Sequence, residues 1–198
     1  MSDQATKRII VGISGASGIV YGVRMLSALR ALGVETHLVV SKAAEMTLAY
    51  ETDLKAKDLR ELADVYHPMA DIGASISSGS FPTLGMVIAP CSVRTMSEIA
   101  TGVTGSLMSR AADVVLKERR RLVLAVRETP LHTGHLRTML ALSEMGAIIA
   151  PLMPAFYNRP QGLDDIVDHS VGRMLDLFGL DAGIVKRWKT EDAVEAEG

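Results

Sequence analysis

Cysteine is almost absent from this chain: Cys91 is the only one among 198 residues. A single thiol excludes an intramolecular disulfide and any metal cluster built from several cysteines. It is typical of a protein in a reducing compartment, so we expect a cytoplasmic location. The opening residues, Met1-Ser2-Asp3-Gln4, do not resemble a signal peptide.

Neither sign of charge dominates, because 21 Lys and Arg residues face 23 Asp and Glu residues, for a net charge of −2. Nucleic-acid-binding proteins carry a basic surplus for the phosphates, so this composition argues against such a partner. No apolar run reaches the roughly 20 residues that a membrane-spanning helix needs, so we expect no membrane insertion. Aromatic residues make up only 4% of the chain, whereas hydrophobic residues make up 48%. The length suits one α/β domain with a full core and is short for two.

Metal-ligand spacing is also missing among the five histidines. His132 and His135 lie closest together in the sequence, but no carboxylate lies at the offset that a metal site would need. We therefore predict no metal, and we expect these two histidines to serve the loop or the cap of the following helix.

Apolar runs bounded by turn residues alternate with segments of helical periodicity. The expected strands are 8–13, 35–40, 85–89, 122–126 and 147–152, and the expected helices are 19–32, 43–50, 93–100, 106–119, 134–145 and 163–178. Strands that are hydrophobic throughout and separated by helices are typical of a doubly wound, mostly parallel sheet. We therefore predict a single Rossmann-like, flavodoxin-like α/β fold with helices on both faces and a ligand at the carboxyl ends of the strands.

The domain is expected to span residues 1–188, followed by a polar, disordered tail at 189–198. The segment 67–83 is rich in Ser, Gly and Ala. We expect it to be an ordered excursion that carries part of a site rather than a linker.

The first strand runs into a loop of small and hydroxyl residues, Gly12-Ile13-Ser14-Gly15-Ala16-Ser17-Gly18. Such a loop before a helix presents backbone N–H groups and the positive end of the helix dipole, which favours a phosphate group. An NAD site is disfavoured, because the G-x-G-x-x-G spacing is missing and the second strand ends at Ser41-Lys42 rather than at an acidic residue. The Gly-Lys-Ser/Thr of a P-loop is absent too, and Ile19 stands where a nucleophile elbow around Ser17 would need glycine.

Hydroxyl groups follow three of the expected strands. Ser14 and Ser17 follow the first, Ser41 follows the second, and Ser92 and Thr95 follow the third. Donors at successive strand ends suit a mononucleotide such as FMN, with its phosphate, ribityl chain and polar ring edge. Each hydroxyl could instead simply cap the next helix, and that alternative stays open for any single position.

The second half of the chain supplies cations. Arg110 and Lys117 are seven residues apart on one expected helix and therefore share a face. Arg127 finishes an apolar strand and should point into the ligand crevice, and Arg173 lies on the last helix. The arginines at 119–121 fit a solvated helix end whose charges complement the dipole.

Several of these segments, in unchanged order, resemble the UbiX flavin prenyltransferases. The similar motifs are the loop at 12–18, Ser41-Lys42-Ala43-Ala44, Glu51-Thr52-Asp53, Ser77-Ser78-Gly79-Ser80, Pro90-Cys91-Ser92, the segment 110–118, the segment 126–131 and Pro154-Ala155-Phe156-Tyr157. The resemblance covers residues 7–188. It implies that dimethylallyl phosphate alkylates reduced FMN at N5, that a second bond at C6 closes a ring, and that phosphate leaves without a metal. It also implies a homododecamer with the flavin at subunit contacts, and prenylated FMN as a product for UbiD-type decarboxylases in ubiquinone biosynthesis or aromatic-acid metabolism.

The resemblance assigns roles to individual residues. The implied FMN-binding residues are Gly15, Ala16, Ser17, Ser41, Ser92, Val93, Arg94, Thr95 and Arg127. The implied dimethylallyl phosphate ligands are Arg110, Lys117, Arg127, Tyr157 and Arg173. The implied catalytic residues are Ser17, Glu51, Lys117, Glu128 and Trp188. The cations would stabilise charge on the departing phosphate, where a metal otherwise would.

Four of these residues carry a more specific expectation. Ser17 is expected near flavin N5, and Glu51 is expected to handle a proton at N5 or C6. The π face of Trp188 could stabilise an allylic cation, although a packing role at an interface is the alternative. Tyr157 could likewise be a plain turn aromatic, but a phenol among cations suits a phosphate better.

Two other functions stay open at this point. An FMN-dependent decarboxylase of the same fold would need a histidine near the flavin ring, for which His67 is the candidate. A non-catalytic flavin carrier or accessory subunit would need neither Glu51 nor the cations.

Overall fold

The computed structural model describes residues 6–188, so the tail predicted at 189–198 lies outside the described residues. The strands are β1 (Arg8–Ile13), β2 (Glu35–Val40), β3 (Val65–His67), β4 (Gly85–Cys91), β5 (Arg121–Val126) and β6 (Ile148–Ile149). The helices are α1 (Ile19–Ala31), α2 (Lys42–Glu51), α3 (Ala56–Glu61), α4 (Val93–Ala100), α5 (Leu107–Lys117), α6 (Thr133–Glu144) and α7 (Leu163–Asp176), with a 3₁₀ turn at Ser75–Ser77.

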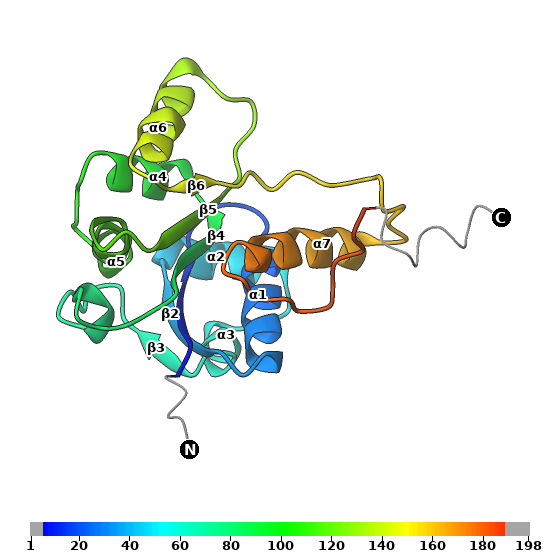
Figure 1. The fold of residues 1–198 in the computed structure, drawn as a ribbon, viewed down its shortest axis with the longest axis horizontal. Coiled ribbons are helices and arrows are strands. Elements are labelled where there is room, and N and C mark those ends of the chain that lie inside the picture. The colour runs from blue at the N-terminus through cyan, green and yellow to red at the C-terminus, as the bar shows by residue number, and fades with distance from the viewer. Residues whose placement is uncertain (1–5, 189–198) are drawn as a thin grey trace.

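The strands form one six-stranded sheet in the order β3-β2-β1-β4-β5-β6. Every neighbouring pair in this sheet is parallel. The sheet is therefore wholly parallel, where the sequence predicted a mostly parallel one. The strand order reverses between β1 and β4, and doubly wound folds bind ligands at the carboxyl ends of the strands beside such a reversal (Figure 1).

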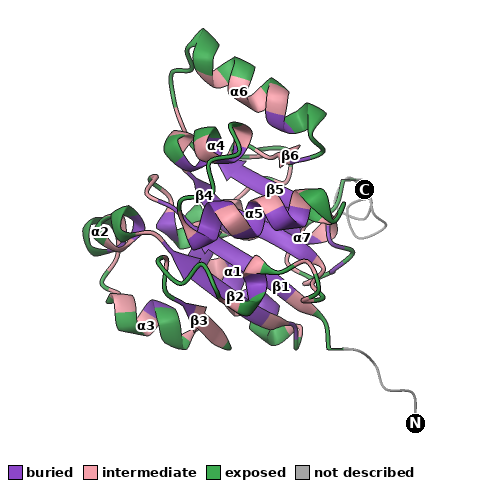
Figure 2. Cartoon of the chain, turned by 90° about the vertical axis from the view of Figure 1, so that its left-hand side faces the viewer, coloured by how far each residue is buried: buried purple, intermediate pink, exposed green. Residues whose placement is uncertain are grey.

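Alternation along the strands creates two cores, one on each face of the sheet. Ile9, Val11 and Ile13 of β1 pack with α1 and α7, whereas Ile10 of the same strand packs with α4 and α5. The central strands are buried along their length (Figure 2). This burial on both faces explains why their sequences are apolar throughout.

The sequence predicted the long elements closely and missed the short ones. Helix α3 and strand β3 were not predicted, because α3 buries only Leu59 and β3 is a three-residue edge strand. Strand β6 is shorter than the predicted 147–152. The backbone beyond it still pairs with β5, through Ala150 N to Leu124 O at 2.9 Å and Leu152 N to Val126 O at 3.1 Å. Pro151 lies between these two donors and faces away from β5, toward the open edge of the sheet, where a proline removes no ladder bond.

Candidate active site

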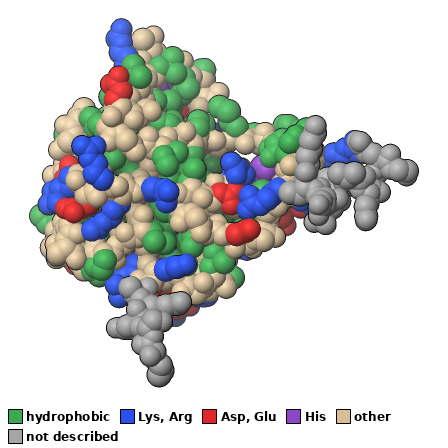
Figure 3. All heavy atoms as spheres, viewed as in Figure 1, with side chains coloured by type: hydrophobic (Ala, Val, Ile, Leu, Met, Phe, Trp, Pro, Cys, Tyr) green, Lys and Arg blue, Asp and Glu red, His purple; other side chains and the backbone are tan. Residues whose placement is uncertain are grey.

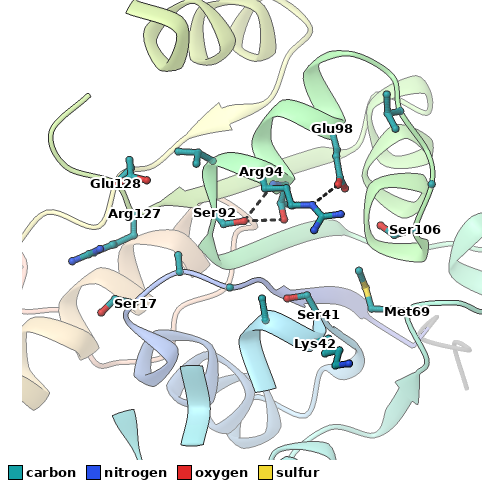
Figure 4. A pocket seen from close by; sticks show the side chains of 17 residues that line it. Ser17, Ser41, Lys42, Met69, Ser92, Arg94, Glu98, Ser106, Arg127 and Glu128 are labelled. Carbon is teal, nitrogen blue, oxygen red and sulfur yellow. Dashed lines mark hydrogen bonds and ion pairs between the residues drawn. The ribbon is translucent and has the colours of Figure 1, made fainter. Parts of the chain in front are cut away.

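A cavity of about 750 Å³ lies at the carboxyl ends of the central strands. It is lined by Gly15, Ala16, Ser17, Ser41, Lys42, Ala43, Met69, Ser92, Val93, Arg94, Thr95, Glu98, Val103, Gly105, Ser106, Arg127 and Glu128. This volume lies within the range of cofactor and small-molecule sites. Ser17 and Arg127 lie toward one end of the cavity, and Met69 and Ser106 lie toward the other (Figure 4).

The loop after β1 is held in place by Ser14. Its side chain is fully buried, donates to Pro90 O at 3.0 Å and accepts from Ser92 N at 2.7 Å. Ser14 thus fastens the loop to the end of β4, and its buried hydroxyl group is not available to a ligand. Gly15 follows it, and a Cβ there would collide with the Ala43 methyl group, so glycine lets the loop approach the start of α2.

The hydroxyls after β2 and β4 cap helices and also line the cavity. Ser41 Oγ accepts from Ala44 N at 3.1 Å, and Ser92 Oγ accepts from Thr95 N at 3.3 Å. The capping interpretation is therefore right for both serines. The first turns of both helices line the cavity, through Lys42 and Ala43 of α2 and Val93, Arg94 and Thr95 of α4. The first amides of a helix have no partner within it. Helix N-termini of this kind favour an anionic group.

Glu51 caps helix α1 from a different part of the chain. Gly18 precedes α1 with φ of 100° and has no side chain, so it cannot cap the helix itself. Instead, the Glu51 carboxylate accepts from Gly18 N at 2.8 Å and Ile19 N at 2.9 Å. Burial raises the pKa of Glu51, but the Ser17 hydroxyl, these two amides and the Arg127 charge outweigh burial and hold that pKa below its usual value. Glu51 is therefore an anion at neutral pH.

Arg127 and Glu128 leave the end of β5 at the rim of the same cavity. Arg127 N donates to Cys91 O at 3.1 Å, which fixes the start of this loop against β4. The single thiol beneath it is fully buried, and burial raises the pKa of Cys91 to about 12. Cys91 is therefore a core residue and not a nucleophile.

A second hollow of about 260 Å³ gathers three other predicted residues. It is lined by Tyr157, Arg173, Val185, Arg187 and Trp188. The Tyr157 and Trp188 rings meet edge to face with centroids 5.3 Å apart. Asp176 accepts from Arg173 at 2.6 Å and from Arg187 at 2.9 Å, which ties the segment after α7 back onto that helix.

Arg110 and Lys117 line neither hollow. Both lie on α5, where Arg110 pairs with Asp113 at 2.9 Å and Lys117 pairs with Glu118 at 2.5 Å. Ser106, which caps the start of α5, lines the large cavity. Lys117 is the last residue of α5, about 16 Å along the helix axis from Ser106 at the usual rise per residue.

His37, His67 and His132 have structural partners. His132 caps α6, since its Nδ1 accepts from Gly134 N at 3.0 Å, as the sequence predicted. His67 lies 2.9 Å from His37 and does not line the large cavity. Within residues 6–188 no group of three or more His, Cys, Asp or Glu side chains is arranged to hold a metal. No helix in this part of the chain is both long enough and apolar enough to span a membrane.

Comparison with known proteins identifies the family. Residues 1–176 match the family described as Flavoprotein. The chain is 59% identical over 186 residues to flavin prenyltransferase UbiX of Escherichia coli K12, covering 92% of this chain and 98% of that protein. It is 56% identical over 181 residues to flavin prenyltransferase UbiX of Thauera aromatica, covering 91% and 93%. The chain belongs to the UbiX family.

A solved structure of the same family supports the fold. AnUbiX (PadA1), in complex with FMN and dimethylallyl pyrophosphate, superposes with a TM-score of 0.92 at 52% identity, covering 93% of this chain and 98% of that one. A dodecameric FMN-dependent UbiX-like decarboxylase from Escherichia coli O157:H7 superposes with a TM-score of 0.90 at 53% identity, covering 92% and 100%.

The residues predicted from the sequence lie in three places, apart from Glu51, which lines neither hollow and caps α1. All of the predicted FMN-binding residues line the large cavity, together with Glu128. Tyr157, Arg173 and Trp188 line the second hollow, while Arg110 and Lys117 lie on α5.

The sequence missed several residues that line the cavity: Lys42, Ala43, Met69, Glu98, Val103, Gly105 and Ser106. Ser106 could have been found, since it is a hydroxyl before an apolar-periodic helix, as Ser41 and Ser92 are. Met69 belongs to the segment 67–83 that was expected to carry part of a site.

Proposed function

We propose that this chain is a flavin prenyltransferase that joins the dimethylallyl group of dimethylallyl phosphate to N5 and C6 of reduced FMN and releases phosphate. The observation that carries this proposal is the geometry of one cavity end. There Ser17 and the cation Arg127 line the cavity, and the Ser17 hydroxyl bonds to the ionised carboxylate of Glu51, which is not itself a lining residue. A simple flavin carrier would not need a base and a cation at this place.

The residues around the cavity fit FMN. Amides of Gly15 and Ser17 and of the first turns of α2 and α4, with the Ser41 and Ser92 hydroxyls, suit the phosphate and the ribityl chain, whereas the Ala16 amide donates to Ser14 O. We assign FMN binding to the residues predicted for it, from Gly15 to Arg127. Bound FMN supplies the nucleophilic N5 and C6 positions, and the protein supplies orientation and charge.

Departure of phosphate breaks the bond between the allylic carbon and oxygen, and negative charge grows on the leaving oxygens. Cations and a phenol can stabilise this charge, and we assign that role to Arg110, Lys117, Arg127, Tyr157 and Arg173. Glu51 is an anion, so it can accept a proton that the reaction releases, with Ser17 as the link to the flavin edge. We propose that the π face of Trp188 stabilises the allylic cation. We place the carboxylate of Glu128 near the reacting centre.

We also propose that the site is completed between copies of the chain. Arg127 and Lys117 lie at opposite ends of the unit formed by α5 and β5, so one copy cannot direct both at one small phosphate. The dodecameric relative supports a homo-oligomer, and we propose a dodecamer. A UbiD-type decarboxylase would receive the product, and the need for reduced FMN favours the cytoplasm.

The test is anaerobic incubation of the protein with reduced FMN and dimethylallyl phosphate, followed by mass spectrometry of the flavin. We expect the mass gain of one prenyl group and stoichiometric release of phosphate. Dimethylallyl pyrophosphate is the parallel donor, because the solved relative holds that compound. A flavin that stays unmodified with both donors would refute the proposal.

The alternative, an FMN-dependent decarboxylase, has less support. Its required histidine would be His67, which bonds to His37 and lies outside the cavity lining. The same incubation with an aromatic acid or a cysteine peptide, assayed for CO₂ release, separates the two activities.

A further inference from the structure

His169 on α7 contacts Tyr157, which lines the second hollow. Neither the sequence analysis nor the proposed mechanism gives His169 a role. Its side chain is buried, with only 6% of the residue exposed. His169 Nε2 lies 3.1 Å from Tyr157 Oη, and the two rings meet edge to face with centroids 5.4 Å apart. Tyr157 is thus held between His169 on one side and Trp188 on the other.

The other ring nitrogen decides the tautomer. His169 Nδ1 is buried and has no hydrogen-bond partner among residues 6–188. A proton on Nδ1 would leave a buried N–H donor unpaired, which folded proteins rarely tolerate. With the proton on Nε2, only a lone pair lacks a partner, and the Nε2–H group donates to Tyr157 Oη.

Burial, more than the nearby charges, favours the neutral form of the ring. Burial lowers the pKa of His169, the Arg173 charge lowers it further, and Asp176 opposes them. Asp176 is itself paired with Arg173 and Arg187, so its influence on the ring is partly neutralised. The imidazole of the pair is therefore a neutral donor to the Tyr157 oxygen.

A phenol that accepts from His169 has its own proton left to donate. That proton can point into the hollow, toward the space lined by Arg173 and Arg187. We propose that His169 is a positioning residue that donates to Tyr157 Oη and so directs the Tyr157 O–H group to the phosphate of the prenyl donor. This inference rests on the proposed function, because it assumes that Tyr157 contacts that phosphate.

The test compares His169→Leu, which removes the donor, with His169→Gln, whose side-chain amide can still donate to Tyr157. For His169→Leu we expect kcat/KM for dimethylallyl phosphate to fall about tenfold, the loss of one hydrogen bond in the reacting complex, with KM for FMN unchanged. His169→Gln should recover most of that loss. In the Tyr157→Phe background, His169→Leu should cause no further loss, because the two residues act through one bond.

A readout without turnover keeps this inference separate from the proposed function. Calorimetry with dimethylallyl phosphate and oxidised FMN measures donor binding, and we expect His169→Leu and Tyr157→Phe to weaken it equally. If wild type binds the donor but never prenylates reduced FMN, the proposed function is wrong while this comparison still tests His169. Equal donor binding in wild type and His169→Leu, or a His169→Gln variant as impaired as His169→Leu, would overturn the inference.

Discussion

At the scale of the single residue, Glu51 caps a helix, and we propose a chemical role for the same carboxylate. Its carboxylate caps α1 and is an anion beside Ser17 and Arg127. Glu51→Gln keeps an oxygen that can accept from the two amides but removes the charge and the ability to take up a proton. We expect the prenylation rate to fall by about 10² to 10⁴-fold, the usual contribution of a general base.

The cap provides the control for this prediction. Glu51→Gln should cost little stability, whereas Glu51→Ala should cost about 1 kcal/mol more, because the two amides lose their acceptor. Single-turnover kinetics by mass spectrometry and urea unfolding measure the two effects. A Glu51→Gln variant that is as fast as wild type would show that the carboxylate is only a cap.

The pH dependence of stability is a property of the edge where β2 meets β3. His67 ends β3, is 8% exposed, and pairs with His37 of β2. Burial and, after it, His37 lower the pKa of His67, while Asp71 opposes them. Below the unfolded pKa of about 6.5 the unfolded chain takes up a proton that the folded chain resists, so stability should fall as pH falls through this range.

Urea unfolding at a series of pH values between about 7.5 and 5.5 measures this loss. His67→Gln cannot titrate, so its unfolding free energy should depend less on pH. His132→Asn is the matched control, because His132 is an exposed helix cap and asparagine also caps well. If His67→Gln and His132→Asn lose stability as steeply as wild type on acidification, His67 is not the titrating group.

The helices and strands show how much of the fold could be predicted from the sequence. The long apolar strands and amphipathic helices could be predicted because their periodicity extends over many residues. The residues that follow the strands could be predicted to share one site because parallel strands end at one edge of the sheet. The three-residue β3 has too little pattern to recognise. The contact of Glu51 with Gly18, 33 residues apart, depends on how α2 packs beside α1 and has no local signature.

On the scale of the whole molecule, basic and acidic residues are nearly balanced, with 21 Lys and Arg against 23 Asp and Glu. On the face drawn in Figure 3, Lys and Arg side chains are interspersed with Asp and Glu rather than gathered in one patch. The cations assigned to the prenyl donor likewise lie at three places on one copy: the large cavity, the second hollow and α5. If these cations act on one phosphate, as we propose, they come from different copies of the chain.

Subunit complementation tests this arrangement. Lys117→Ala and Arg127→Ala should each be nearly inactive alone, because each removes a cation from every site. If the two side chains reach one site from different copies, co-assembled Lys117→Ala and Arg127→Ala chains should form some sites with both cations intact. Random mixing in equal amounts should restore about a quarter of the wild-type activity.

Ser17→Ala with Arg127→Ala is the matched control, since both residues line the same cavity of one copy and mixing should restore nothing. Light scattering and affinity tags confirm that mixed oligomers have formed, and mixed oligomers of the first pair that stay inactive would show that the site does not span copies.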